Sequence, residues 1–367
     1  MEYNEITGPG AFIKVFGVGT GGINAVNHMI ASDLQGVDFI AADTDASALK
    51  TSLATLTILL GPSCCKGKGT HGELDAGRRA AEESLAAIKD AVSDADLVFV
   101  VAGLGGGTGS GAAPVIAKVA KESGALTVGV VTKPFYFEGK KRLETTEAGI
   151  AEFREHVDSL IIIPNDRLIQ VGKKKAIFSE MLKMADGALY TAVRGISDLT
   201  TIPGLIGLDF ADVKTIMGMH GFAMMGEGRG TGETRARDAA TRAITSPLLE
   251  GVSIGNAQGV LMNITCGPDI TLNEVTEAAG IIQEEAHPDA QILFGTVFDD
   301  SVGDEMLITV IATGLDLITG TPPHKDVSGM DVQSGSAPEI IRHKTRAATD
   351  FQFDDDDESI PAYIKTS

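Results

Sequence analysis

The sequence contains no apolar run that approaches the roughly 18 residues needed to cross a bilayer as a helix. Its first ten residues include two glutamates and no basic residue, so the positively charged start of a secretory signal is missing. These two absences predict a soluble, cytoplasmic protein without direct membrane insertion.

Cysteine is scarce. Cys64, Cys65 and Cys266 have no metal-ligand spacing, and an odd count does not suggest a disulfide framework. We interpret them as small, partly buried residues in a reducing compartment.

Basic residues are outnumbered, with 30 Lys and Arg against 50 Asp and Glu, giving a formal net charge of −20. Binding to the phosphate backbone of nucleic acids needs clustered Lys and Arg, so nucleic acid is not an expected partner. A small anion held by backbone amides remains compatible with this charge.

The first half of the chain alternates short apolar runs with helical patterns. Strands are expected at residues 12–16, 38–42, 97–101, 126–131 and 160–163, and helices at 21–32, 74–91 and 111–123. Strands that are apolar on both faces and alternate with helices indicate a parallel α/β sheet.

A long helix is expected at residues 178–199, closed by Pro203 and Gly204. Beyond it, strands at 259–265, 291–296 and 306–311 and helices at 234–243 and 272–285 indicate a smaller α+β domain. Residues after 320 are rich in Pro, Gly, Ser, Asp and Lys and are expected to form a flexible tail. The predicted organisation is an N-terminal extension (1–10), a nucleotide-binding domain (11–175), a central helix (176–203), a C-terminal α+β domain (204–317), and a disordered linker with a terminal peptide (318–367).

A GxGxxG turn at residues 17–22 follows a strand and opens a helix. Glycines there let the backbone approach a phosphate, and the helix N-terminus offers free amides. Alone, this turn fits a dinucleotide-binding fold, because Asp43 or Asp45 stands where such a fold places its ribose acid.

A second turn, residues 103–111, has six glycines in nine positions and also joins a strand to a helix. A dinucleotide fold needs one such loop, whereas two loops at neighbouring strand ends can hold both ends of a triphosphate. The alternative is a merely flexible tight turn. There is no GxxxxGK[ST], so the phosphates would be met by amides and a metal rather than by a P-loop lysine.

The motif GGGTGSG at residues 105–111 resembles the signature of the tubulin/FtsZ family. Four further stretches resemble that family in the same order: TKPFYFEGKKR (132–142), IPNDRL (163–168), DFADVKT (209–215) and SPLL (246–249). The resemblance extends from about residue 11 to 315. It implies a GTP-binding, GTP-hydrolysing protein that polymerises head to tail into filaments, forms a cell-division ring, and uses GTP/GDP with Mg²⁺.

The resemblance also assigns residues. It implies that the phosphates, ribose and base are held by Thr20, Gly21, Gly22, Ile23, Asn24, Gly107, Thr108, Gly109, Glu138, Arg142, Asn165 and Asp186. The loop at residues 67–77 would sense the terminal phosphate. From the residues alone, Glu138 and Arg142 could instead be a surface i,i+4 ion pair, and Asp186 could be an exposed helix acid. A carboxylate at the base would favour guanine, which presents two adjacent N–H donors.

Asp209 and Asp212 are the acids that the resemblance implies to be catalytic, on a loop that reaches the nucleotide of the next subunit and orients the attacking water. Judged from spacing alone, two acids three residues apart are more often a helix cap. The metal ligands are not identified by the sequence.

Three positions depart from the family pattern. Gly207 replaces an Asn, Leu182 replaces an aromatic residue at the guanine, and Asp43 replaces an Asn near the phosphates. These changes affect rate and affinity more than fold. They keep open a GTP-binding paralogue with weak or no hydrolysis, while a nicotinamide-dependent oxidoreductase would leave the second glycine turn unexplained.

The chain ends with an apolar patch at residues 360–364, which includes Ile360, Tyr363 and Ile364. It resembles the terminal peptide by which such proteins dock membrane-tethering division proteins. The expected location is the cytoplasm at the division site, on the inner face of the membrane.

Overall fold

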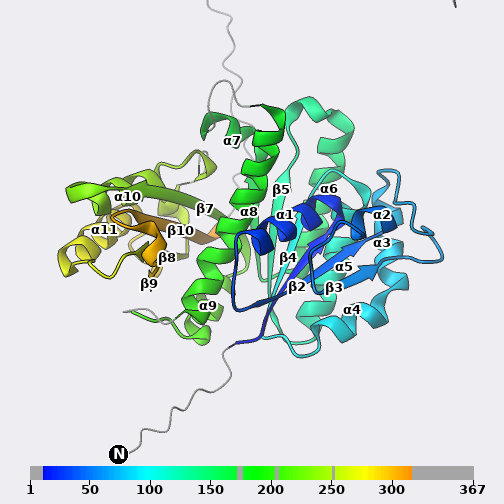
Figure 1. Ribbon diagram of the computed structural model, residues 1–367, viewed down its shortest axis with the longest axis horizontal. Helices are drawn as coiled ribbons and strands as arrows, with labels where there is room; N and C mark the ends of the chain where they lie inside the picture. Colours follow the sequence, from blue (N-terminus) through cyan, green and yellow to red (C-terminus); the bar gives the residue numbers. More distant parts are fainter. Residues whose placement is uncertain (1–10, 172–176, 203–205, 250–252, 316–367) are drawn as a thin grey trace, which may run out of the picture. The chain divides into compact units, whose positions relative to one another are not determined.

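A ten-stranded sheet runs through the part of the chain that the computed structural model describes, residues 11–171, 177–202, 206–249 and 253–315 (Figure 1). The strand order is β3-β2-β1-β4-β5-β6-β7-β10-β8-β9. The N-terminal extension, the linker and the terminal peptide at residues 360–364 lie outside the described residues, as do Pro203 and Gly204.

The first six strands are all parallel to their neighbours. Their bounds are β1 Ile13–Val18, β2 Val37–Asp43, β3 Leu56–Leu59, β4 Leu97–Gly103, β5 Leu126–Lys133 and β6 Ser159–Pro164. Parallel alignment brings the carboxyl ends of β1 and β4 to the same edge of the sheet, where both glycine-rich turns begin.

Helices cover both faces of this parallel part, as the alternating side chains of β4 illustrate. Val98 and Val100 belong to one apolar cluster with Ile116 of α5, whereas Phe99 and Val101 belong to the other. The helices of this part are α1 Gly19–Ala31, α2 Ala46–Leu49, α3 Leu74–Glu83, α4 Leu85–Val92, α5 Gly107–Glu122, α6 Lys140–His156 and α7 Asn165–Val171, with the 3₁₀ turn η1 Tyr136–Glu138.

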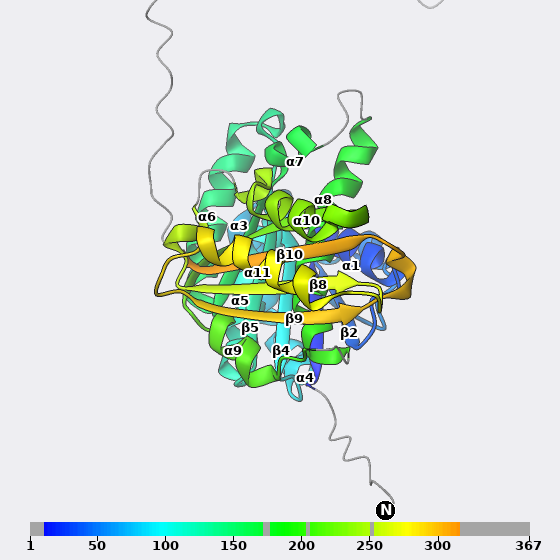
Figure 2. The same cartoon turned by 90° about the vertical axis from the view of Figure 1, so that its left-hand side faces the viewer.

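The second part extends the sheet through β7 Gly221–Gly230, β8 Gly259–Cys266, β9 Gln291–Phe298 and β10 Met306–Leu315. β10 is antiparallel to both β7 and β8, so this part is mixed. β7 meets β6 through only three residue pairs, from Ser159–Gly221 to Ile161–Ala223. Figure 2 shows α10 Arg235–Ile244 and α11 Leu272–Glu285 beside these strands. The short 3₁₀ turns are η2 Gly232–Thr234, η3 Pro247–Leu249, η4 Ile254–Asn256 and η5 Asp300–Val302.

The central helix α8, Phe178–Thr201, lies between the two parts and contacts strands of both (Figure 1). Its 24 residues make it about 36 Å long at the usual rise of about 1.5 Å per residue. The helix α9, Phe210–Met217, follows its C-terminal end. The predicted fold class, a parallel α/β sheet joined by a long helix to a smaller α+β part, is confirmed.

Some elements differ from the prediction. The helix expected at residues 74–91 is two helices, because Ser84 leaves helical geometry (φ −100°, ψ 12°) and its hydroxyl accepts a hydrogen bond from the Gly61 amide. The strands β3 and β7 were not expected. Within the described residues, no helix is long and apolar enough to span a membrane. The predicted domain bounds stay a prediction.

Candidate nucleotide site

The two glycine-rich turns lie against each other at the carboxyl ends of β1 and β4. A Cβ added to Gly21 would stand 3.2 Å from the Cα of Gly103, and one added to Gly19 would stand 3.1 Å from the Gly109 amide nitrogen. Gly19 also has a φ of 71°, which favours glycine. Side chains at these positions would therefore push the turns apart.

Both turns end in helix N-termini whose amides are open. α1 starts at Gly19 and α5 starts at Gly107, and neither has a side-chain cap. The first amides of a helix lack intrahelical partners, and the helix dipole is positive there. Two such ends at one edge of the sheet make a strong site for an anion.

A cavity of about 420 Å³ opens above these turns. It is lined by both turns, by Asp43 and Asp45 at the end of β2, by a third loop that contributes Gly69, Thr70 and Gly72, and by six further residues. These are Thr132, Pro134, Glu138, Arg142, Asn165 and Leu182. We call this cavity the glycine cleft.

Most of the residues expected to bind the nucleotide line the glycine cleft: Thr20, Gly21, Gly107, Thr108, Gly109, Glu138, Arg142 and Asn165. Four of them do not line it: Gly22, Ile23, Asn24 and Asp186. Gly22 and Ile23 are buried beneath the first turn, whereas Asn24 is exposed on α1. The binding roles of all these residues stay a prediction.

Sequence reasoning did not single out Thr132 and Pro134 as site residues. Thr132 lies near the carboxyl end of β5 and Pro134 comes directly after that strand, which pairs with β4. The signal was available, because the carboxyl end of a strand beside a glycine-turn strand must reach the same edge of the sheet.

A buried carboxylate lies beside the two glycine-rich turns. Asp43, which is 2% exposed, accepts hydrogen bonds from the amides of Thr44 (2.7 Å) and Asp45 (3.1 Å) and from the Thr20 hydroxyl (3.2 Å). Burial raises the pKa of Asp43, although these hydrogen bonds oppose the rise. Asp43 and Asp45 both line the cleft.

The implied Mg²⁺ fits these two acids. No group of three or more His, Cys, Asp or Glu side chains in the described ranges is placed to hold a metal by itself. Mg²⁺ commonly binds through one or two carboxylates together with substrate phosphates and water, so a complete protein cage is not required.

The far end of the cleft offers acceptors for a polar ligand. Asn165 is 7% exposed, and its Oδ1 is buried without a hydrogen-bond partner. Leu182, which is 43% exposed, lies at the cleft on α8, and Asp186 follows one helical turn later. Burial raises the pKa of Asp186 to about 6. An orphaned acceptor at this place points to a ligand that donates hydrogen bonds.

Glu138 and Arg142 form the ion pair that their spacing allows, with Arg142 Nη1 2.6 Å from Glu138 Oε2. Both also line the glycine cleft. The ion pair is therefore confirmed, while the binding role stays a prediction that is compatible with it, because a guanidinium has further N–H donors for a phosphate.

Asp209 and Asp212 lie far from the cleft. Asp209 is the N-cap of α9: its Oδ1 accepts the Asp212 amide (2.8 Å), while the Asp209 amide donates to Asp212 Oδ2 (3.4 Å). Leu182 lies near the N-terminus of α8, and the acids follow its C-terminus (Figure 1). Most of the helix length of about 36 Å therefore separates the acids from the cleft of the same chain.

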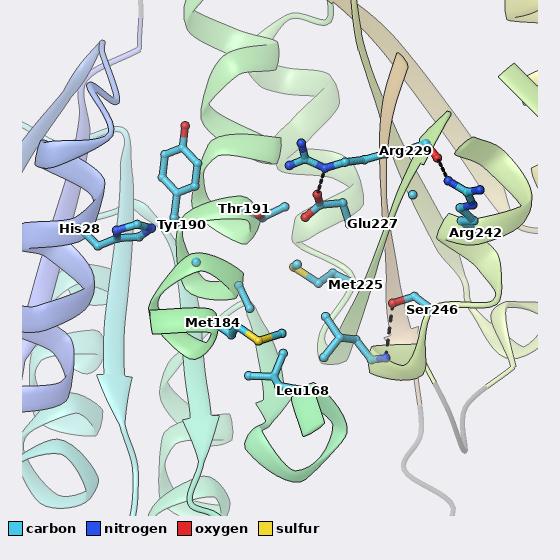
Figure 3. A pocket seen from close by; sticks show the side chains of 14 residues that line it. His28, Leu168, Met184, Tyr190, Thr191, Met225, Glu227, Arg229, Arg242 and Ser246 are labelled. Atoms are coloured by element: carbon cyan, nitrogen blue, oxygen red, sulfur yellow. Dashed lines mark hydrogen bonds and ion pairs between the residues drawn. The ribbon is translucent and has the colours of Figure 1, made fainter. Parts of the chain in front are cut away.

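A larger cavity, about 610 Å³, lies elsewhere, between α8, β7 and α10 (Figure 3). Met184 of α8 faces Met225 of β7 across it, and Tyr190 of α8 lies next to His28 of α1. Its cationic Arg229 is paired with Glu227 (3.0 Å), and Arg242 donates to the Arg229 carbonyl (2.6 Å). The cavity contains no glycine-rich helix start, so the glycine cleft is the better anion site despite its smaller volume.

The fold and the glycine cleft together define an α/β protein of the nucleotide-binding class. Two family models match the chain. One is described as the Tubulin/FtsZ family, GTPase domain, and covers residues 12–173; the other is the FtsZ family, C-terminal domain, and covers residues 221–316.

The chain is 48% identical over 337 residues to the Cell division protein FtsZ of Magnetospirillum gryphiswaldense. That match covers 92% of this chain and 60% of the relative, so the chain spans about three fifths of the length of this curated relative. A solved FtsZ dimer from M. jannaschii is 38% identical, with a TM-score of 0.79 over 83% of this chain and 88% of that one.

CetZ2 from Haloferax volcanii, solved as a GTPgS-bound protofilament, is 21% identical with a TM-score of 0.71 over 83% of this chain and 93% of that one. That likeness concerns the fold alone. On the family models and the M. jannaschii match, the chain belongs to the tubulin/FtsZ family.

Proposed function

We propose that the protein binds GTP in the glycine cleft, hydrolyses it to GDP and phosphate, and polymerises head to tail into filaments. The observation that carries this proposal is the placement of the two expected halves of the active site at opposite ends of α8. A single chain cannot bring Asp209 and Asp212 to its own cleft, whereas a second copy stacked along the helix axis can do so. This is a heterologous contact, which generates an open filament when its rotation does not close into a ring.

In the cleft, the phosphates would be held by the amides of Gly107, Thr108 and Gly109 and by the first turn at Thr20 and Gly21. Arg142 would add charge-assisted hydrogen bonds to phosphate oxygens. Mg²⁺ would be held through Asp43 or Asp45, where it neutralises part of the phosphate charge.

The guanine would lie at the far end. Asn165 offers its unpartnered Oδ1 to a donor on the ring, and Asp186 would accept the two adjacent N–H donors that distinguish guanine from adenine. Leu182 would cover the base by apolar contact alone, so nucleotide affinity is expected to be lower than with a stacked aromatic ring.

Asp209 and Asp212 of one copy would orient the water that attacks the γ-phosphate in the cleft of the next. Phosphoryl transfer depends mostly on positioning and charge stabilisation, so a separated subunit would bind nucleotide and remain nearly inactive. The capping arrangement of these acids holds their loop in a defined conformation and does not compete with this role.

The proposed setting is cell division, in the cytoplasm at the inner face of the membrane. The relative from Magnetospirillum gryphiswaldense is called a cell division protein, and one solved relative is an FtsZ dimer. The proposed partners are further copies of the chain and membrane-tethering division proteins that bind residues 360–364, outside the described residues.

The test is phosphate release from GTP in the presence of Mg²⁺, measured as specific activity against protein concentration. We expect almost none in dilute protein and a rise above a threshold concentration. Asp212→Asn should abolish turnover while retaining GTP binding, whereas Asp289→Asn, a change at an exposed acid elsewhere, should leave turnover unchanged. Specific activity that is independent of concentration would refute the shared site.

The alternative is a GTP-binding filament or regulatory paralogue with weak hydrolysis, which the glycine at position 207 favours. GTP binding and assembly without phosphate release at any concentration would select this alternative.

A further inference from the structure

Two adjacent thiols, Cys64 and Cys65, occupy the turn between β3 and α3 (Figure 1). Their Sγ atoms lie 3.7 Å apart. Cys64 is exposed, and Cys65 is partly buried against the apolar core. The third cysteine, Cys266, is buried in β8, so the pair is chemically separate from it.

The turn holds both sulfurs in place. The carboxylate of Glu83 accepts hydrogen bonds from the amides of Ser63 (2.7 Å) and Cys64 (3.0 Å), and the Cys65 amide donates to the Gly61 carbonyl (2.9 Å). Gly61 has a φ of 60°, and a Cβ there would stand 2.5 Å from the Cys64 Sγ. The glycine therefore makes room for the thiol, and the dithiol is preorganised.

Simple oxidation does not suit this pair. Neighbouring Cα atoms lie about 3.8 Å apart, below the range of roughly 4.4–6.8 Å that disulfides prefer. Burial, with Glu83 and Cys65 as additional causes, raises the pKa of Cys64 to about 11, so its thiol is protonated at pH 7 and slow in thiol–disulfide exchange.

A closed metal site is also absent, because no third ligand of the usual types completes the pair in the described ranges. The sulfurs can nevertheless be bridged by one thiophilic atom. Two S atoms bonded to one centre at about 2.3 Å with a near-tetrahedral angle lie about 3.8 Å apart, close to the observed separation. The suitable ligand is a centre that needs only two sulfurs.

We propose that Cys64 and Cys65 form a binding site for trivalent arsenicals. With an arsine oxide, R–As=O, the two S–H bonds break and two As–S bonds form. The arsenic oxygen leaves with the two protons as one water molecule. Arsenic and sulfur keep their oxidation states, so the step needs no oxidant or reductant.

The site is connected to the glycine cleft through a short stretch of backbone. The Lys68 amide donates to the Cys65 carbonyl (3.0 Å), and the Gly69 amide donates to the Thr44 carbonyl (3.1 Å). Gly69 and the following Thr70 line the cleft. The arsenic atom and its organic group would occupy space beside this loop and displace it, so occupation of the site lowers nucleotide affinity; this coupling rests on the proposed GTP binding.

The binding test uses the full-length protein, phenylarsine oxide and intact-protein mass spectrometry. We expect one adduct, heavier by one phenylarsine oxide less one water, that a small dithiol removes and an equal concentration of monothiol does not. Cys64→Ser and Cys65→Ser should each lose the adduct, whereas Cys266→Ser should keep it. Thermal melting of each variant without the arsenical checks that it is folded. No adduct on the unmodified chain, or an adduct that survives in folded Cys64→Ser, would overturn the site.

The coupling test measures the affinity of a fluorescent GTP analogue with and without the adduct. We expect a loss of about tenfold, within the usual range of coupling between sites. An unchanged affinity would overturn the coupling. If the chain forms the adduct but binds no GTP analogue in either state, the proposed function fails while the arsenical site stands.

Discussion

Protonation of Asp186 should weaken GTP binding as the pH falls. Burial raises the pKa of this carboxyl to about 6, and only the ionised form accepts both N–H donors of guanine. With that pKa the ionised fraction is about 0.9 at pH 7 and about 0.1 at pH 5. Affinity for GTP should therefore fall about tenfold between these two values.

A second carboxyl of the cleft is present in both proteins compared below. Burial also raises the pKa of Asp43, which is one of the two acids proposed to hold Mg²⁺. Any effect of its protonation is common to the unmodified chain and to Asp186→Asn, so it cancels in the ratio of their affinities.

The assay is a titration of a fluorescent GTP analogue at pH 5, 6, 7 and 8, with the unmodified chain beside Asp186→Asn. Protonation of the nucleotide itself affects both proteins equally, so the ratio of their affinities isolates the carboxyl. Asp186→Asn should bind about 10- to 100-fold more weakly at pH 7, as expected for losing hydrogen bonds to a charged group, and this ratio should fall about five- to tenfold by pH 5 as the ionised fraction falls. A constant ratio across this range would refute the role of Asp186 at the base.

Three further substitutions test the site and the fold. Gly109→Ala would press a Cβ onto the backbone carbonyl oxygen of Gly103, so GTP affinity should fall at least 100-fold in the same titration. The control Gly280→Ala, in open space on α11, should leave the affinity unchanged. In Gly207→Asn, no non-neighbouring atom of the described residues lies within 4 Å of the new Cβ. The change also restores the residue type that the family resemblance leads us to expect, so phosphate release per protein should rise without loss of Tm. Arg235→Met would leave Glu274 without its partner at 2.6 Å in a buried setting, costing about 3–5 kcal/mol in urea unfolding; a loss under about 1 kcal/mol would contradict that assignment.

The sequence predicted the parallel core and its glycine turns because their signals are local. The strand β4 is a continuous apolar run, and the turn after it is rich in glycine. The helix starting at Gly107 was expected four residues later, since glycines at a helix N-terminus look like loop.

The strand β7 was not predicted because its residues are determined by tertiary packing. Its residues GFAMMGEGRG show no alternation, and a Cβ on Gly226, Gly228 or Gly230 would strike the backbone of α10. These glycines let α10 lie close against the strand. The need for glycine at these positions therefore arises from packing against a segment further along the chain, which the local sequence of β7 does not reveal. The short β3 was missed because only Ile58 of its four residues is buried.

The cleft was predicted in outline, since its turns lie at neighbouring strand ends. The distance between the cleft and Asp209 could not be predicted from the sequence, because it depends on the direction in which α8 crosses the molecule. The separation of the acids from the cleft is thus a result of the structure.

That separation has two consequences for the proposed filament: the number of complete active sites is fixed by its length, and its two ends differ. In the proposed filament, n copies would complete only n − 1 active sites, because one terminal copy would present a cleft that lacks acids and the other would present acids that face no cleft. Nucleotide exchange would then be fast only at the terminus with the open cleft, so the two ends would grow and shrink at different rates. The average number of turnovers per copy would rise with filament length, which makes catalysis a measure of how long the filaments are.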